Sequence, residues 1–249
     1  MIKLVEITKR YGALAAVDSL SLEVPPGEVF GFLGPNGAGK TTTIRMMMGI
    51  LRPSSGRVFL GGHDVEQEPE KAKALAGFIP DRPFIYEKLT GCEFLQFVGN
   101  LHHVESQRLR RRITELLDRL ELTRWKDELV ESYSHGMKQR LVVCGALIHE
   151  PPILVVDEPM VGMDPRGSRT LKDLFRSLAE SGTAVFLSTH SINVAEEVCH
   201  RIGIIQRGRL IACGTMMDLQ SQAKNKHGNL ESVFLELTQD ADGIGEISC

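Results

Sequence analysis

Alternating and continuous runs of apolar residues predict short strands separated by helices. Period-two alternation predicts strands at 2–8 and at 20–24, the second ending before Pro25. Short runs bounded by turn residues predict strands at 57–60 and 77–79, and continuous apolar runs predict buried strands at 29–33 and 184–187 and a central parallel strand at 153–156. Because helical segments lie between several of these strands, the pattern predicts an α/β fold with a parallel, doubly wound sheet.

A helical period replaces the strand pattern between residues 84 and 150. Apolar residues recur there at steps of three and four, as on one face of an amphipathic helix, at Leu109, Ile113, Leu116, Leu117 and Leu120. We therefore expect a single domain over 1–249, with a core at 1–83 and 151–220 and a helical subdomain at 84–150. Residues 221–249 are expected as a C-terminal extension with an amphipathic helix in 228–238 and a frayed end from 239.

Two local patterns complete the predicted core. A turn at Arg207-Gly208 predicts a hairpin over 201–211. Thr215 followed by Asp218 predicts the cap of a short helix.

Composition narrows the class of protein. The chain has 249 residues, 42% apolar and 24% charged, with a net charge of −3 and a pI near 6.3, which argues against bulk attraction to nucleic acid or anionic lipid. We find no apolar run of bilayer-spanning length and no signal peptide, so we expect a cytoplasmic protein unless a partner carries it to a membrane. Five scattered cysteines without a C-x-x-C spacing are expected as free thiols, with no metal and no catalytic role.

One stretch between a predicted strand and a predicted helix has the spacing G-x-x-x-x-G-K-[ST] of a phosphate-binding loop. It reads Gly34, Pro35, Asn36, Gly37, Ala38, Gly39, Lys40, Thr41, Thr42. Its glycines let backbone N–H groups point at phosphate oxygens, at the positive end of the following helix. Lys40 supplies an ammonium for the β and γ phosphates, Thr41 a hydroxyl for Mg²⁺, and Thr42 a donor for the α phosphate. The stretch therefore predicts a site for a nucleoside triphosphate. The alternative is a glycine-rich turn with a solvated lysine, which the flanking strand and helix disfavour.

Two carboxylates, Asp157 and Glu158, follow the predicted strand 153–156. Asp157 would hold Mg²⁺ through water or the Thr41 hydroxyl, and Glu158 would orient or deprotonate the attacking water. The alternative, an acidic pair that only starts a helix, loses weight beside a phosphate loop. His190 follows the next buried strand, so all three motifs lie at carboxyl ends of strands, where doubly wound sheets bind ligands.

Two further features stay open at this level. Tyr11 lies between the first two predicted strands, either as an exposed loop aromatic or as a stacking platform for a base. An arginine cluster at 108–112 could suggest nucleic acid, but acidic residues follow it on the same predicted helix. This mixture of charges favours a solvated polar face.

Together these motifs resemble the ATP-binding subunits of ABC transporters, over about residues 2–219. The decisive likeness is to the family's signature motif, upstream of the acidic pair, in Tyr133-Ser134-His135-Gly136-Met137-Lys138-Gln139-Arg140. Ser134 is expected as an N-cap and Gly136 permits close backbone approach, so the following helix directs its positive end at an anion. In the family that anion is the γ-phosphate bound by the other subunit. The resemblance therefore implies a site shared by two chains and dimerisation that depends on ATP.

The resemblance also implies a fold, ligands and partners. The fold is a P-loop ATPase with a RecA-like, mainly parallel sheet, an antiparallel N-terminal β part and a helical subdomain. The ligands are ATP and Mg²⁺, and the partners are a transmembrane permease and a second copy or a related ATPase subunit, with no nucleic acid. The chain would lie on the cytoplasmic face of the cell membrane through the permease. Segments 86–91 and 232–237 are similar to exporter-type members, which favours export of a substrate that the permease selects.

Site residues follow position by position from the same resemblance. Glu158 and His190 are implied as catalytic, the latter as the switch histidine that senses the γ-phosphate. The implied metal site consists of Thr41, Asp81 and Asp157. Implied nucleotide contacts are Tyr11, Val17, residues 34–42, Ser134, Gly136, Met137 and, in the D-loop, Asp164.

The chain departs from the family pattern in two motifs. Tyr133, His135 and Met137 replace three positions of the usual Leu-Ser-Gly-Gly-Gln signature, while Ser134 and Gly136 are kept. Asp81 replaces the Q-loop glutamine, and we expect it to reach the metal through water. The following segment 82–101 is rich in aromatic residues, and we expect it to receive the permease.

Two other function classes share a phosphate loop. A soluble ABC ATPase acting on DNA or ribosomes would carry long coiled coils or a second cassette, neither of which fits in this chain. A small-molecule kinase would need neither Ser134 nor His190.

Overall fold

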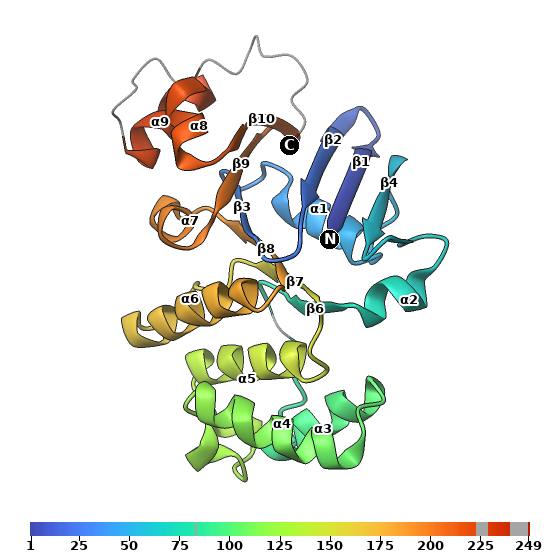
Figure 1. Cartoon of the computed structure of the whole chain (residues 1–249), viewed down its shortest axis with the longest axis vertical. Coiled ribbons are helices and arrows are strands. Elements are labelled where there is room, and N and C mark those ends of the chain that lie inside the picture. The colour runs from blue at the N-terminus through green and yellow to red at the C-terminus, as the bar shows by residue number, and fades with distance from the viewer. Residues whose placement is uncertain (83, 223–228, 240–248) are drawn as a thin grey trace.

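The computed structural model describes residues 1–82, 84–222, 229–239 and 249. Within these residues a six-stranded sheet, in the order β10-β9-β3-β8-β7-β6, forms the centre, and a four-stranded sheet, β2-β1-β4-β5, lies to one side (Figure 1). The central strands are β3 (Val29–Leu33), β6 (Ala76–Ile79), β7 (Ile153–Asp157), β8 (Ala184–Thr189), β9 (Arg201–Gln206) and β10 (Arg209–Gly214). The smaller sheet comprises β1 (Ile2–Tyr11), β2 (Leu14–Val24), β4 (Ser55–Leu60) and β5 (His63–Asp64).

Helices cover both faces of the central sheet. They are α1 (Lys40–Met47), α2 (Pro69–Ala74), α3 (Gly91–Leu101), α4 (Ser106–Arg119), α5 (His135–Leu147), α6 (Pro165–Glu180), α7 (Ile192–Val198), α8 (Met216–Gln222) and α9 (Leu230–Gln239). Figure 1 shows α3, α4 and α5 gathered at the end of the molecule away from the smaller sheet. None of the helices in the described part of the chain combines the length and the hydropathy needed to cross a bilayer.

The predicted parallel sheet is confirmed. β3 pairs in parallel with β8 and β9, and β7 pairs in parallel with β6 and β8, while β10 joins the edge antiparallel. Every residue of β7 and β8 is buried, because successive side chains enter two different cores. Leu154 packs in the core with the helices α3 to α6, whereas Val155 packs in the core with α1 and the smaller sheet.

The amphipathic pattern predicted for the middle of the chain corresponds to α4. Its buried residues are Leu109, Ile113, Leu116 and Leu117, which join one core with apolar residues of α3 and α5. Thr90 and Glu93 form a capping box at the start of α3, which satisfies backbone N–H groups that the helix leaves unpaired. Helices α3, α4 and α5 lie within the range 84–150 where we expect the helical subdomain.

The N-terminal hairpin is longer than the sequence pattern predicted. Tyr11 belongs to β1, and β2 already begins at Leu14, so the expected connection at 9–12 is mostly strand. Positive φ angles of 47° at Glu6 and 50° at Ser19, with register shifts after Leu4 and Ile7, interrupt the pairing. These irregularities disturb the period-two alternation that would have revealed the full strands. The short elements β5 and α7 were not predicted either.

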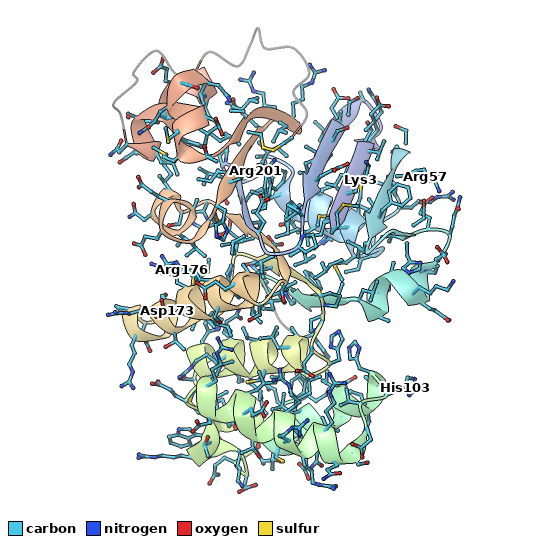
Figure 2. The ribbon with its side chains drawn as sticks, viewed as in Figure 1. Lys3, Arg57, His103, Asp173, Arg176 and Arg201 are labelled. Atoms are coloured by element: carbon cyan, nitrogen blue, oxygen red, sulfur yellow. A yellow bond between two sulfur atoms is a disulfide. The ribbon has the colours of Figure 1, made fainter. Side chains whose placement is uncertain are left out.

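The expectation of five free thiols is wrong for two of them. A disulfide joins Cys213 on β10 to Cys249 at the end of the chain. Cys249 lies beside β2, because Glu23 N–H donates to its carbonyl at 2.7 Å and its own N–H donates to Ser21 O at 3.4 Å. Arg201, labelled in Figure 2, lies within 2.7 Å of the Cys249 sulfur. Cysteine spacing could not show this pairing, because the pairing depends on where the end of the chain lies in the fold. The frayed end that we expected from residue 239 lies mostly outside the described residues.

Candidate nucleotide site

The glycine loop connects the centre of the parallel sheet to α1. Gly37 and Gly39 have φ angles of 79° and 112°, which side chains rarely adopt. A Cβ at Gly39 would also lie 2.5 Å from the Ala16 carbonyl oxygen of β2. Gly39 is the N-cap of α1 and supplies no side-chain cap, so the positive end of the helix faces the loop. This arrangement is typical of an anion site.

Lys40 connects the loop to the acidic pair. Its side chain is only 6% exposed, and its ammonium donates to Gly34 O at 2.7 Å and to Pro35 O at 3.2 Å. The ammonium also lies 3.4 Å from Glu158 Oε1. Two motifs that are more than one hundred residues apart therefore meet at one cation.

Asp157 and Glu158 occupy the carboxyl end of β7 in different surroundings. Asp157 is buried and accepts hydrogen bonds from the hydroxyls of Ser188 and Thr41. Burial raises the pKa of Asp157, the charges of Asp81 and Glu158 act in the same direction, and the two hydroxyl donors lower it. This concentration of negative charge fits a bound cation, because carboxylate and hydroxyl oxygens are the ligands that Mg²⁺ prefers.

Glu158 is positioned by the backbone and by His190. Its φ angle is 50°, and its N–H donates to Ser188 O at 3.1 Å, so the side chain leaves the strand in a direction different from that of Asp157. Glu158 Oε2 lies 2.9 Å from His190 Nδ1. Its Oε1 is buried, has no hydrogen-bond partner among the described residues, and faces the Lys40 ammonium. A carboxylate held in this way can accept a proton from a water molecule.

These residues enclose one hollow of about 370 Å³. Its lining consists of Ala16, Asn36, Gly37, Gly39, Lys40, Thr41, Thr42, Asp81, Glu158, Val161 and His190. The structure thus gathers the phosphate loop, the acidic residues and the histidine around one space. Asp81 lies at this space, as its proposed metal role requires.

Two of the nucleotide contacts implied by the resemblance, Tyr11 and Val17, are not among the described residues that line the hollow. Tyr11 is 53% exposed near the tip of the N-terminal hairpin, where the Lys9 ammonium lies 5.5 Å from the centre of its ring. Val17 is fully buried beneath the loop, and its neighbour Ala16 lines the hollow instead. The role of Tyr11 stays a prediction, and a direct contact of Val17 with nucleotide would require its burial to change.

The signature residues lie at the start of α5. Ser134 is the N-cap of this helix, as predicted, and its hydroxyl accepts from Met137 N–H at 3.3 Å. A Cβ at Gly136 would have no described atom within 4 Å, so the space beside this glycine is open. Met137 packs against the core that α3 to α6 share with one face of the central sheet. Ser134, Gly136 and Met137 are not among the described residues that line the hollow.

Asp164 has a local structural role. It is the N-cap of α6, and its carboxylate accepts from Gly167 N–H at 2.6 Å. Asp164 therefore caps α6, and its contact with nucleotide stays a prediction.

Sequence reasoning missed three residues at the site. Ser188 bonds to Asp157 because the two are register partners in the parallel strands β7 and β8. A serine at the end of a buried strand next to an acidic strand end was the available signal. Ala16 and Val161 line the hollow through the folding of the chain and have no chemical signature in the sequence.

Comparison with known proteins identifies relatives across most of the chain. A family described as ABC transporter matches residues 17–161. The daunorubicin resistance ATP-binding protein DrrA3 of Streptomyces coeruleorubidus is 42% identical over 214 residues, covering 86% of this chain and 68% of that protein. The linearmycin resistance ATP-binding protein LnrL of Bacillus subtilis (strain 168) is 38% identical over 222 residues, covering 89% of this chain and 71% of that protein.

Solved structures agree in fold. An ATP-binding subunit of an ABC transporter superposes with a TM-score of 0.91 at 30% identity, covering 96% of this chain and 99% of that one. A dimeric ATP-binding cassette bound to ADP and Pi after hydrolysis superposes with a TM-score of 0.78 at 25% identity, covering 87% of this chain and 99% of that one.

Proposed function

The chain belongs to the ABC transporter family as an ATP-hydrolysing subunit. From this premise we propose which residues bind ATP and which take part in its hydrolysis. ATP is bound by residues 34–42 of one copy and covered by Ser134, Gly136 and Asp164 of a second ATPase subunit. Hydrolysis in this shared site drives export through a separate transmembrane permease. The observation that carries the proposal is the contact of Lys40 with Glu158 in the hollow that the phosphate loop lines.

Lys40 is the cation that exchanges partners when phosphate binds. In the structure its ammonium contacts two loop carbonyls and Glu158. Phosphate oxygens are stronger acceptors for an ammonium than neutral carbonyls are, so triphosphate would draw Lys40 from them. The same exchange would free Glu158 for the attacking water.

The acidic residues fit a magnesium ion. Thr41, Asp157 and Asp81 would hold Mg²⁺, directly or through water, together with phosphate oxygens of the nucleotide. The ion supplies charge neutralisation for the β and γ phosphates when bound. Ser188 fixes the orientation of the Asp157 carboxylate by its hydrogen bond.

Glu158 and His190 act next to each other at the reacting group. Glu158 orients the water and accepts its proton. His190 holds Glu158 Oε2 by the 2.9 Å contact and, with half of its side chain exposed, can turn toward a γ-phosphate. The tautomer of His190 decides which partner receives its proton.

The second copy is required because the signature residues are not among the described residues around the hollow of their own chain. The α5 N-terminus is capped by Ser134 and open at Gly136, so it offers an anion site to another molecule. Binding across two chains makes dimerisation depend on ATP, and release of phosphate reopens the dimer.

The permease is proposed to dock on a groove between the core and the helical subdomain. The groove is about 330 Å³ in volume and is mainly apolar, with Met48, Phe78, Phe84, Phe94, Val98 and Val142 in its lining. Phe84 is 89% exposed and packs edge-on against Tyr86, whose ring in turn packs on Phe97. Such an exposed aromatic cluster beside an apolar groove is suited to a short helix from a membrane protein.

A sedimentation assay with membranes of the cell that makes the chain tests this docking. Combined Phe84→Ala and Tyr86→Ala should reduce recruitment about tenfold, since removing two anchors of this kind costs more than 1.4 kcal/mol of binding. ATP hydrolysis by the free chain should change little. Trp125→Ala is the matched control, because Trp125 is also an exposed aromatic of the helical subdomain but lies outside the groove lining.

Glu87 is unsuitable for this test because it forms an ion pair with Lys138, which follows the signature on α5. Parental recruitment of the double variant would place the docking surface elsewhere. Recovery of the chain with ribosomes or nucleic acid instead of membranes would contradict the transport role.

The cargo is proposed to be a small antibiotic-like molecule. The support is that relatives are named for resistance to daunorubicin and to linearmycin. Cells whose only copy carries Lys40→Ala should then become more sensitive to such compounds. Unchanged sensitivity across a panel of them would argue for a different cargo.

A further inference from the structure

The segment after Glu158 contacts the hollow on one side and the signature on the other. Val161 lines the hollow, and its N–H donates to the backbone carbonyl oxygen of Glu158 with an N···O distance of 3.4 Å, so this turn is tied to the backbone of the catalytic residue. Gly162 follows with a φ angle of 74°. A Cβ at Gly162 would lie 2.9 Å from Cδ2 and 3.0 Å from Nε2 of His135, so the imidazole edge packs directly on this glycine.

His135 stands between the two signature residues assigned to the partner's nucleotide. It is the first residue of α5, after the Ser134 cap and before the open Gly136. The residue is exposed, and its ring has no hydrogen bond or ion pair to another residue in the described part of the chain. The contact with Gly162 is therefore not imposed by burial or by a polar partner.

We propose that His135 is a positioning residue that couples the two ATP sites of the dimer through its contact with Gly162. The inference rests on the proposed shared site. Ser134 and Gly136 meet the nucleotide of the partner, whereas Glu158 acts on the nucleotide of its own chain. A shift of the α5 N-terminus toward phosphate moves the His135 ring, and the ring moves the Gly162 turn that leads to Glu158.

The coupling depends on a side chain at position 135. The usual family signature has glycine there, which could not reach the turn. The contact works through repulsion at van der Waals distance, so a displacement of the ring toward Gly162 displaces the turn. Two sites that communicate in this way should bind or hydrolyse ATP cooperatively.

The first test is the ATP dependence of hydrolysis by the full chain. The parent should show a Hill coefficient above 1, with 2 as the limit for two sites. His135→Ala should bring the coefficient to about 1, because it removes the ring that contacts Gly162. His135→Phe retains a ring against Gly162 and should retain cooperativity.

The second test is a double-mutant cycle. Gly162→Ala should lower kcat in the parent, because the new methyl meets the His135 ring and because the φ angle disfavours alanine. The φ penalty is the same with and without His135, so the loss should be smaller by about threefold or more in the His135→Ala background. Gly182→Ala is the matched control, with a φ angle of 94° and no described atom within 4 Å of its Cβ, and its effect should not depend on His135.

A parent Hill coefficient of 1, an unchanged coefficient in His135→Ala, or additive losses in the cycle would each overturn the coupling. These outcomes differ from failure of the proposed function. If the proposed function were wrong, the parent itself would not hydrolyse ATP or would not dimerise with ATP. Cooperative parent activity with unchanged His135→Ala behaviour leaves the shared site intact and removes only the role of His135.

Discussion

Glu158→Gln separates the chemical step from nucleotide binding. The amide has nearly the same shape as the carboxylate, so the contact with His190 can be kept with the amide group. What the change removes is a negative charge 3.4 Å from the Lys40 ammonium and the only proton-accepting form of the side chain. ATP binding should persist or strengthen, because a negative charge near the phosphates is lost while Lys40 remains.

The expected loss follows from the role of a positioned base. General base catalysis contributes about 10²- to 10⁴-fold, and each tenfold corresponds to about 1.4 kcal/mol, so the variant should lose about 3 to 5 kcal/mol of transition-state stabilisation. The burial of Glu158, whose side chain is 12% exposed, favours the full effect because bulk water does not readily replace the missing base. Slow hydrolysis should also allow an ATP-bound dimer to accumulate.

The assay measures phosphate release at saturating ATP, nucleotide affinity by equilibrium titration, and dimer formation by light scattering. Glu180→Gln, which removes an exposed carboxylate at the end of α6, is the control for loss of charge alone. Thermal unfolding of both variants checks the fold. A Glu158→Gln chain that is folded and hydrolyses ATP near the parental rate would refute the assignment of Glu158 as the base.

Three further predictions concern other parts of the site and the groove. Tyr11→Ala should weaken ATP binding by about ten- to a hundredfold if its exposed ring stacks on the base, as measured by titration, and an unchanged affinity would leave Tyr11 as a surface residue. Asp81→Asn should raise the Mg²⁺ concentration for half-maximal hydrolysis, and equal values would remove Asp81 from the metal site. His149 also lines the groove, and burial lowers its pKa to about 4. The unfolded chain therefore binds an extra proton between about pH 4 and 6.5, and the folded state loses stability as pH falls through this range. The urea midpoint of His149→Gln should therefore fall less between pH 7 and pH 5 than that of the parent; equal falls would show that His149 is not the source.

The sequence predicted best those features that come from strong local patterns. β7 and β8 were found because their residues are apolar without interruption, which is typical of strands buried on both faces. The phosphate loop and the acidic pair were found because phosphate chemistry requires particular residues at fixed spacing, and the fold then brings Lys40 and Glu158 together.

Features that depend on distant segments were not predictable in this way. The disulfide requires Cys249 to return to Cys213 on β10, beside β2, and no spacing rule encodes that return. The strand position of Tyr11 was hidden because bulges break the alternation of β1 and β2. The contact of His135 with Gly162 joins a helix N-terminus to a loop through shape alone, so neither residue carries a signal for it.

Each ATP site is proposed to be built from two chains, and a mixture of two inactive variants tests this arrangement. Lys40→Ala destroys the phosphate loop of its own chain, whereas Ser134→Arg blocks the signature that the chain offers to its partner. A mixed dimer then contains one site with both defects and one site with none. Single-turnover hydrolysis should be absent from each variant alone and return in the mixture to about a quarter of the parental amplitude, because half of randomly assorted dimers are mixed and one of their two sites is intact. A mixture of folded variants that stays as inactive as its components would contradict the shared site.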